Sequence, residues 1–340
     1  MKYIGMDAHS STCRLSVMDA EGKEIDNVNI ITNGRLLVNY LERIEGEKKL
    51  TFEECELSQW LYAILKPHVE ELIVCNPVAN RQYKRAKTDK LDAQHLAQLL
   101  RGGFLKSVYH DGSRREQLRS LLSGYQDIVE EGVRLKNRYK SLFRKSGKRL
   151  IRESVYNDES LLVDLKRSDF KFMGEQIFEL LGKLEEIRQK YLQQIRQQSR
   201  RFKEISLLKT IPGIGELSAA RIVSQVIDPS RFNNKYKYYS YCGLVRHKRE
   251  SGGKDYGSEK IWGNRVLKYV YKMAAHSALR MTDNSFHRYY EHLRFKGLSD
   301  QNARSAVCRK IAAISLSLWK HHKKYDDQIL SGLIEIKSAA

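Results

Sequence analysis

The hydrophobic pattern of the first hundred residues alternates between a period of two and a period near 3.6. Short apolar or alternating runs predict five strands, at 2–6, 13–18, 25–30, 49–53 and 71–75. Apolar residues three and four positions apart predict three helices, from Asn33 to Ile44, from Trp60 to Lys66 and from Asp89 to Arg101. Gly102 and Gly103 end the last helix.

The order of these elements is three strands, helix, strand, helix, strand, helix. Only turns separate the first three strands, so these predict an antiparallel meander, whereas strands reached through helices predict parallel additions. This is the order of ribonuclease H-like folds, and we expect an α/β domain of that class at residues 1–104. A likeness at this level concerns the fold and not the function.

Beyond residue 105 the pattern is helical. Apolar positions within 113–145 and 174–200 predict two long amphipathic helices that form a helical hairpin or a coiled-coil arm. No proline occurs between Pro77 and Pro212 to interrupt them. We therefore expect a helical coiled-coil linker and a mainly α C-terminal domain, with boundaries at 105–204, 205–330 and, for a short tail, 331–340.

A glycine-rich turn, Ile211-Pro212-Gly213-Ile214-Gly215, precedes a helix in the C-terminal domain. Such a turn presents backbone N–H groups at the start of a helix, where a phosphate binds well. Gly213 and Gly215 are thus candidate contacts to nucleic acid in a helix–hairpin–helix-like motif. An ordinary tight turn is the alternative.

The charge of the chain is uneven. Its 340 residues include 61 Lys and Arg against 41 Asp and Glu, a net charge of +20, yet residues 1–104 hold 14 basic and 15 acidic side chains. The excess beyond residue 104 indicates a polyanionic partner, most simply nucleic acid. Candidate phosphate contacts on the first long helix are Arg134, Lys136, Arg138, Lys140, Arg144 and Lys145, with a solvated helix face as the alternative.

Several signals point away from membranes and secretion. No run of 18 apolar residues occurs, and Asp7 stands where a secretory leader would be apolar. The five cysteines are scattered singly, without a C-x-x-C spacing, which is typical of reduced thiols and not of a zinc site. We expect a cytoplasmic protein with no membrane partner.

Four carboxylates of the first domain fall where a metal site needs them. Asp7 ends the first strand, and Glu53 ends the fourth, which lies beside the first in the expected sheet. Asp89 and Asp92 are three residues apart and share one helix face. Converging carboxylates bind Mg²⁺ or Mn²⁺, which can polarise a phosphodiester. Each acid taken alone is more often a helix cap or a solvated charge.

The second acid has rivals in Glu54 and Glu56. In a strand, side chains alternate between the two faces, so Phe52 on the apolar face leaves Glu53 on the other. The alternation favours Glu53 and leaves the two rivals open.

The segment Lys87-Thr88-Asp89-Lys90-Leu91-Asp92-Ala93 resembles the KTDxxDA signature of DEDD-type transposases, the insertion-sequence "one-ten" family. IGMDAH around Asp7 resembles the first-strand motif of that family, and FEECELSQWLYAIL resembles the segment of its second acid, which matches Glu53. RLKNRYKSLFRKSG resembles its helical linker, while IPGIG, YCGLVR and ESGG resemble its C-terminal domain. The bulky residues after Glu53 depart from the small ones common in the family.

The resemblance implies an enzyme, a site-specific recombinase that moves its own insertion sequence. Its RuvC-like domain would carry the metal-binding tetrad Asp7, Glu53, Asp89 and Asp92, and its C-terminal domain a serine nucleophile at the position of Ser251. It implies Mg²⁺ or Mn²⁺ and a covalent phosphoserine link to DNA. The nearby Arg246, Lys248 and Arg249 are candidate clamps for the phosphate, with an ordinary basic loop as the alternative.

The resemblance also implies partners. These are double-stranded donor and target DNA and a structured non-coding bridge RNA that pairs with both, in the nucleoid of a prokaryotic cell. Dimers and tetramers are expected, with the tetrad of one subunit completing the serine site of another.

Two other functions fit part of the sequence. A RuvC-like metal-dependent nuclease or junction resolvase would use the four acids without a covalent step and would not need Ser251. A non-catalytic DNA-binding factor would use the basic helices and would tolerate the loss of the acids.

Overall fold

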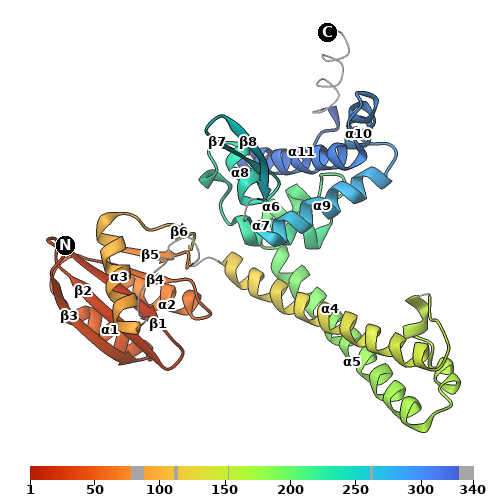
Figure 1. The fold of residues 1–340 in the computed structure, drawn as a ribbon, viewed down its shortest axis with the longest axis horizontal. Coiled ribbons are helices and arrows are strands. Elements are labelled where there is room, and N and C mark those ends of the chain that lie inside the picture. The colour runs from red at the N-terminus through yellow and green to blue at the C-terminus, as the bar shows by residue number, and fades with distance from the viewer. Residues whose placement is uncertain (78–87, 111–113, 152, 261–262, 329–340) are drawn as a thin grey trace. The chain divides into compact units, whose positions relative to one another are not determined.

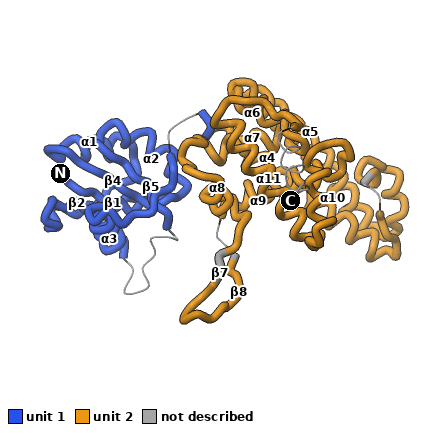
Figure 2. The backbone as a smooth tube through the Cα atoms, turned by 90° about the horizontal axis from the view of Figure 1, so that it is seen from above, with its two compact units in different colours: residues 1–116 blue, residues 117–340 orange. Residues whose placement is uncertain are grey.

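The computed structural model describes residues 1–77, 88–110, 114–151, 153–260 and 263–328. They divide into two units, Met1–Glu116 and Gln117–Ala340 (Figures 1 and 2). The first unit is built on a mixed α/β sheet and the second is largely helical, as the hydrophobic pattern predicts. The expected tail at 331–340 lies outside the described residues, and the domain boundaries at 104 and 204 stay predictions.

Within the described part of the first unit, one sheet has the strand order β3-β2-β1-β4-β5-β6. The strands are β1 (Lys2–Ala8), β2 (Thr12–Met18), β3 (Glu24–Ile31), β4 (Lys48–Glu53), β5 (Glu71–Cys75) and β6 (Ser107–Val108). Strands β1, β2 and β3 are antiparallel neighbours, and β4 and β5 continue the sheet parallel to β1. The predicted meander with parallel additions is confirmed. The short antiparallel edge strand β6 is an addition that the sequence pattern does not predict.

The three predicted helices of this unit are confirmed, although the second begins at Ser58, two residues before the predicted Trp60, and ends at Leu65. They are α1 (Gly34–Arg43), α2 (Ser58–Leu65), a 3₁₀ turn (Lys66–His68) and α3 (Asp89–Gly102). The Asn33 side chain accepts hydrogen bonds from the first backbone N–H groups of α1, as expected of a cap. Gly103 ends α3 with a φ of 71°, a left-handed conformation that favours glycine.

The two faces of the sheet differ in the size of their side chains. One face presents large apolar residues to α1 and α2, among them Ile4, Met6, Leu50 and Phe52. The alternate positions Gly5, Ser16 and Thr51 face the other way and are small.

Helix α3 lies on the face of small residues and meets β1 backbone to backbone. A Cβ atom added to Gly5 would stand 2.1 Å from the carbonyl oxygen of Ala93 and 2.4 Å from the amide nitrogen of Ala97. Only glycine permits this approach, which places the first turn of α3 near the end of β1.

Two long helices, α4 (Arg114–Lys145) and α5 (Ser168–Ser199), form an antiparallel hairpin (Figure 1). Near its base the Arg188 guanidinium donates a hydrogen bond to the Tyr125 hydroxyl at 3.3 Å. Toward its tip the rings of Tyr139 and Phe178 are 6.4 Å apart. Short 3₁₀ turns at Glu153–Tyr156 and Glu159–Asp164 precede α5.

A helical cluster follows the arm, and the first turns of α4 belong to its core. Its elements are α6 (Lys203–Leu208), α7 (Glu216–Val226), a 3₁₀ turn (Pro229–Arg231), α8 (Lys235–Tyr241), β7 (Arg246–Ser251), β8 (Lys254–Lys260), α9 (Arg265–Arg280), α10 (Ser285–Phe295) and α11 (Asp300–His321). Leu118 and Leu122 of α4 are buried in the same apolar core as Val223 of α7 and Val270 of α9. The core therefore joins α4 to the C-terminal helices.

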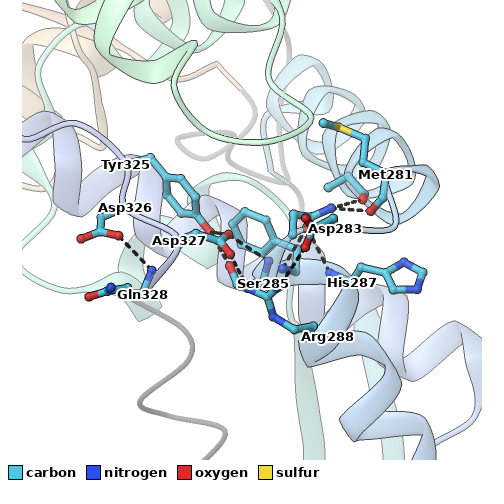
Figure 3. Close-up of polar contacts among 12 residues, drawn as sticks. Met281, Asp283, Ser285, His287, Arg288, Tyr325, Asp326, Asp327 and Gln328 are labelled. Atoms are coloured by element: carbon cyan, nitrogen blue, oxygen red, sulfur yellow. Dashed lines mark hydrogen bonds and ion pairs between the residues drawn. The ribbon is translucent and has the colours of Figure 1, made fainter.

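The segment after α11 returns to the start of α10 (Figure 3). The Asp327 carboxylate accepts a hydrogen bond from the Ser285 amide at 2.9 Å and pairs with Arg288, while the Tyr325 ring stacks on Phe286. Burial alone would raise the pKa of Asp327, but these hydrogen bonds and the arginine outweigh it and lower that pKa. The last described residues are thus anchored on the helical core.

None of the helices in the described ranges is long and apolar enough to cross a membrane.

Replacing Gly5 by alanine should push α3 away from β1. We expect Gly5→Ala to lower the free energy of unfolding of the first unit by at least about 2 kcal/mol, because the new Cβ overlaps backbone atoms that cannot rotate away. Denaturant unfolding monitored by far-UV circular dichroism measures the loss. Gly34→Ala is the matched control, since a Cβ there meets only the side chains of Ile64 and Trp60, at 3.3 Å and 3.4 Å. Equal stability of the two variants would contradict the close contact.

Candidate active site

Three side chains meet at the end of β1. Asp7, His9 and Asp89 each offer a ligand atom, and these atoms all lie within 4.8 Å of one another. The Nε2 atom of His9 is 3.1 Å from Oδ2 of Asp7 and 3.9 Å from Oδ1 of Asp89. Asp7 is the most buried of the three, with 20% of its side chain exposed, and the other two are open to solvent. The sequence predicts the two aspartates of this group and does not single out His9.

The start of α3 fixes the position of Asp89. Thr88 precedes the helix in an extended conformation, and its hydroxyl accepts a hydrogen bond from the Leu91 amide at 3.4 Å. Asp89 is therefore the first residue of the helix, and Asp92 follows in the same turn. Both carboxylates stand at the positive end of the helix dipole.

Asp7 carries the clearest electrostatic signature of the group. Its pKa is raised mainly by burial, with further contributions from the nearby negative charges of Asp89 and Asp92, while His9 acts in the opposite direction. A buried carboxylate among other carboxylates is stabilised by a cation. The donor set therefore fits a divalent metal ion such as Mg²⁺ or Mn²⁺, which prefers oxygen ligands.

Glu53 lies outside this group of three, and strand register places it nearby. Met6 of β1 pairs with Phe52 of β4, so the next positions, Asp7 and Glu53, follow on neighbouring parallel strands. Both share the sheet face of Gly5, on which α3 packs. Among the described residues the close group holds neither Glu53 nor Asp92, although the charge of Asp92 reaches Asp7.

The two rivals of Glu53 are placed differently. Glu54 follows the end of β4, and its carboxylate lies 3.6 Å from Nε2 of His110, whose side chain is buried. Glu56 is exposed in the turn that follows β4. The register thus favours Glu53 as the acid nearest to Asp7.

Ser251 lies in the second unit, at the end of β7. It pairs with Lys254 of β8 across a two-residue turn formed by Gly252 and Gly253, whose φ values are 57° and 74°. Two consecutive left-handed residues are typical of a type I′ hairpin turn, which explains both glycines. The hairpin extends from the body of the second unit (Figure 2). Ser251 is exposed.

The basic residues before Ser251 belong to the same hairpin. Arg246 donates a hydrogen bond from its guanidinium to the carbonyl of Ser258 at 2.8 Å, and Arg249 lies 3.7 Å from the carboxylate of Glu259. Lys248 is on β7, and its side chain is outside what the structure describes. Arg246 and Arg249 therefore help to hold the two strands together.

The basic residues of α4 fall into distinct environments. Arg134 pairs with Glu131 at 2.5 Å, and the amines of Lys136 and Lys140 lie over the ring of Tyr156, at 4.6 Å and 5.2 Å from its centroid. Arg134 is exposed despite this ion pair; Arg138, Arg144 and Lys145 are also exposed, and the described residues show no ion pair for these three. These three are the best placed of the six to meet phosphates.

The turn at 211–215 packs on α9. Gly213 has a φ of 85°, and a Cβ there would stand 2.2 Å from the carbonyl oxygen of Ala274. Gly215 precedes α7 without a side-chain cap, so the first amides of that helix are left to other partners. Both glycines border a cavity of about 610 Å³ whose rim includes Lys209 and Arg280.

Known protein families match both units. A model described as a transposase of the DEDD type matches residues 4–147, and the model of the transposase IS116/IS110/IS902 family matches residues 205–291. The transposase for insertion sequence element IS1111A of Coxiella burnetii is 21% identical over 324 residues, covering 92% of this chain and 86% of that protein. The pilin gene-inverting protein of Moraxella bovis is 26% identical over 126 residues, 36% of this chain and 39% of its own.

Loss of one ligand should weaken metal binding by the group at β1. We expect Asp89→Asn to lower the affinity for Mn²⁺ by about ten-fold or more, because the amide removes a charged ligand beside the half-buried Asp7. His9→Gln should also weaken binding, because the His9 ring nitrogen belongs to the same group of ligand atoms. Electron paramagnetic resonance titration of free Mn²⁺ measures both, with the exposed Glu45→Gln as control. An unchanged affinity in Asp89→Asn would exclude this site.

Proposed function

This chain belongs to the IS116/IS110/IS902 family of transposases and is a DNA-recombining enzyme, and from that premise we propose that it cuts and rejoins DNA through a covalent bond between Ser251 and a DNA phosphate. The observation that carries the proposal is the position of Ser251. Ser251 is exposed beside the type I′ turn of a hairpin that projects from the second unit.

The proposed step exchanges one phosphodiester for another. The Ser251 oxygen attacks the phosphorus atom, an O–P bond to serine forms, and the O–P bond to one deoxyribose breaks. The serine proton is lost to solvent and the departing sugar oxygen takes up a proton. Because the number of phosphoester bonds is unchanged, a sugar hydroxyl of another strand can reverse the step without an external energy source.

The acids of the first unit supply the second part of the proposal. Asp7 and Asp89, with Glu53 and Asp92 beside them, would hold Mg²⁺ or Mn²⁺ on a ribonuclease H-like sheet. When bound, such an ion stabilises the negative charge that develops on the phosphate. The packing of α3 on Gly5 keeps the carboxylate of Asp89 close to that of Asp7.

Nucleic-acid contacts are proposed at two further places in the second unit. The turn with Gly213 and Gly215 would act as a helix–hairpin–helix that binds a backbone phosphate through the free amides of α7. The exposed Arg138, Arg144 and Lys145 on α4 would add contacts that do not depend on sequence.

The DNA target would then be selected by base pairing with a bridge RNA, and the active assembly would be a dimer or tetramer.

Similarity to a pilin gene-inverting protein supports cutting with rejoining. It thereby favours a recombinase over a RuvC-like nuclease without a covalent step, and over a DNA-binding factor without catalysis.

The nucleophile is tested by trapping the protein on DNA. We expect Ser251→Ala to abolish the covalent protein–DNA adduct formed with a labelled copy of the element's end and its bridge RNA, since alanine lacks the attacking oxygen. Denaturing gel electrophoresis detects the adduct, and mass spectrometry of the wild-type adduct should locate the phosphate on Ser251. Ser258→Ala, on the partner strand of the same hairpin, is the matched control and should retain the adduct. An adduct in Ser251→Ala would refute the assignment.

The acids are tested in the same assay. Asp7→Asn and Asp89→Asn should reduce adduct formation by about a hundred-fold or more, because the charge on the phosphate loses its stabilisation. Adduct formation at the wild-type level by both variants would show that Asp7 and Asp89 have only a structural role.

A further inference from the structure

A second cavity of the helical unit, of about 550 Å³, lies between α4, α7 and α9. It is separate from the hairpin of Ser251 and from the turn with Gly213. Its volume is in the range of cavities that bind small organic groups. Its lining includes three arginines from three different helices, Arg119, Arg221 and Arg265, together with the exposed ring of Tyr269.

Two of these arginines are held in place by uncharged partners. Arg119 donates from Nε to the backbone carbonyl of Ser224 at 3.2 Å, and Arg221 donates to the side-chain oxygen of Gln126 at 2.8 Å. Both side chains are half-buried. In the described part of the chain, neither guanidinium pairs with a carboxylate.

Half-buried cations without a counter-ion are costly unless an anion joins them. The acidic residue of the described lining, Glu130, is engaged elsewhere: it accepts from the Gln126 amide at 3.1 Å and lies 3.8 Å from Arg134. The remaining donors of Arg119 and Arg221 are thus oriented and available, in the planar arrangement that matches a phosphate.

The rest of the cavity suits a flat apolar group. Tyr269 is 57% exposed and Val266 is 40% exposed, one turn apart on α9, and both line the cavity. Tyr271, two residues on, is fully buried, so the tyrosines of this helix differ in role. An exposed aromatic face beside oriented guanidinium groups is the combination on which unstacked bases bind.

We propose that this cavity binds one nucleotide, with its base on Tyr269 and Val266 and its phosphate on Arg119 and Arg221. The inference rests on the proposed action on nucleic acid and adds to it a site that takes a nucleotide out of the base stack. A nucleotide extruded from a strand and a free mononucleotide offer the same chemistry, and the experiment separates them.

The test measures equilibrium binding of the full-length chain to a labelled single-stranded 20-nucleotide DNA by fluorescence anisotropy. Tyr269→Ala should weaken binding roughly five-fold or more, as expected when one base loses its aromatic partner. Arg221→Gln should also weaken it and should reduce the slope of log Kd against log salt by about one. A strand of abasic sites should bind wild-type and Tyr269→Ala equally, because it has no base to stack.

Two variants outside the cavity serve as matched controls. Phe295→Ala removes an aromatic ring that is 91% exposed on α10, and Arg201→Gln makes the same change of charge as Arg221→Gln. Both should bind the normal strand within two-fold of wild-type. Because Tyr269 is exposed, its variant keeps the fold and carries the test even if Arg221→Gln unfolds.

A titration with adenosine monophosphate identifies the source of the nucleotide. The site is assigned to a free mononucleotide if adenosine monophosphate binds saturably, both cavity variants weaken that binding, and their binding to the DNA strand is unchanged. The site is assigned to a nucleotide extruded from a strand if both variants bind the DNA strand more weakly. If both variants bind strand and mononucleotide as the wild-type does, the inference is wrong while the proposed function stands. A wild-type chain that binds no nucleic acid would remove the proposed function as well.

Discussion

The contact between Gly5 and α3 is the constraint on which the candidate metal site depends. With no side chain between β1 and the helix, the carbonyl of Ala93 and the amide of Ala97 rest on the strand itself. Small residues at Ser16 and Thr51 extend the same flat surface to the neighbouring strands. A larger residue at position 5 would move the start of α3 outward, and with it Asp89, away from Asp7. The ability of the carboxylates to converge is therefore a property of the sheet face and not of the acids themselves.

In the second unit, another glycine allows two backbone segments to pack closely against each other. Gly213 brings the turn before α7 against the backbone of α9 at Ala274. The close approach sets how α7 and α9 lie against each other, and the first turns of α4 pack on both through Leu118 and Leu122. The cavity of about 550 Å³ is lined by residues of these three helices. Gly213 thus helps to set the arrangement of two of the helices that line this cavity.

The sequence predicts most of the fold and only part of the site, and the difference has physical causes. Elements with a buried face leave a periodic pattern, which is why the meander, the parallel strands and the long helices are all expected. Strand β6 has two residues and is too short for any period, while β7 and β8 are polar on both faces and carry no apolar alternation. Ser251 could be found only from its resemblance to a family motif, because a serine before two glycines otherwise indicates an ordinary turn.

Single side chains that act through spatial neighbours are harder still to predict. In the sequence, nothing distinguishes an exposed histidine two residues after an aspartate. His9 can be recognised as a candidate ligand only in the folded chain, where α3 places Asp89 beside it.

Arg119 and Arg221 are separated by about a hundred residues and resemble the many other arginines of a basic chain. What distinguishes them is the nature of their partners. Arg134 and Arg188 are paired with glutamates and are largely neutralised within the fold. Arg119 and Arg221 are held by a carbonyl and an amide, which orient a guanidinium group without cancelling its charge. In a chain with a net charge of +20, the informative arginines are therefore those whose orientation is fixed and whose charge is left for a partner.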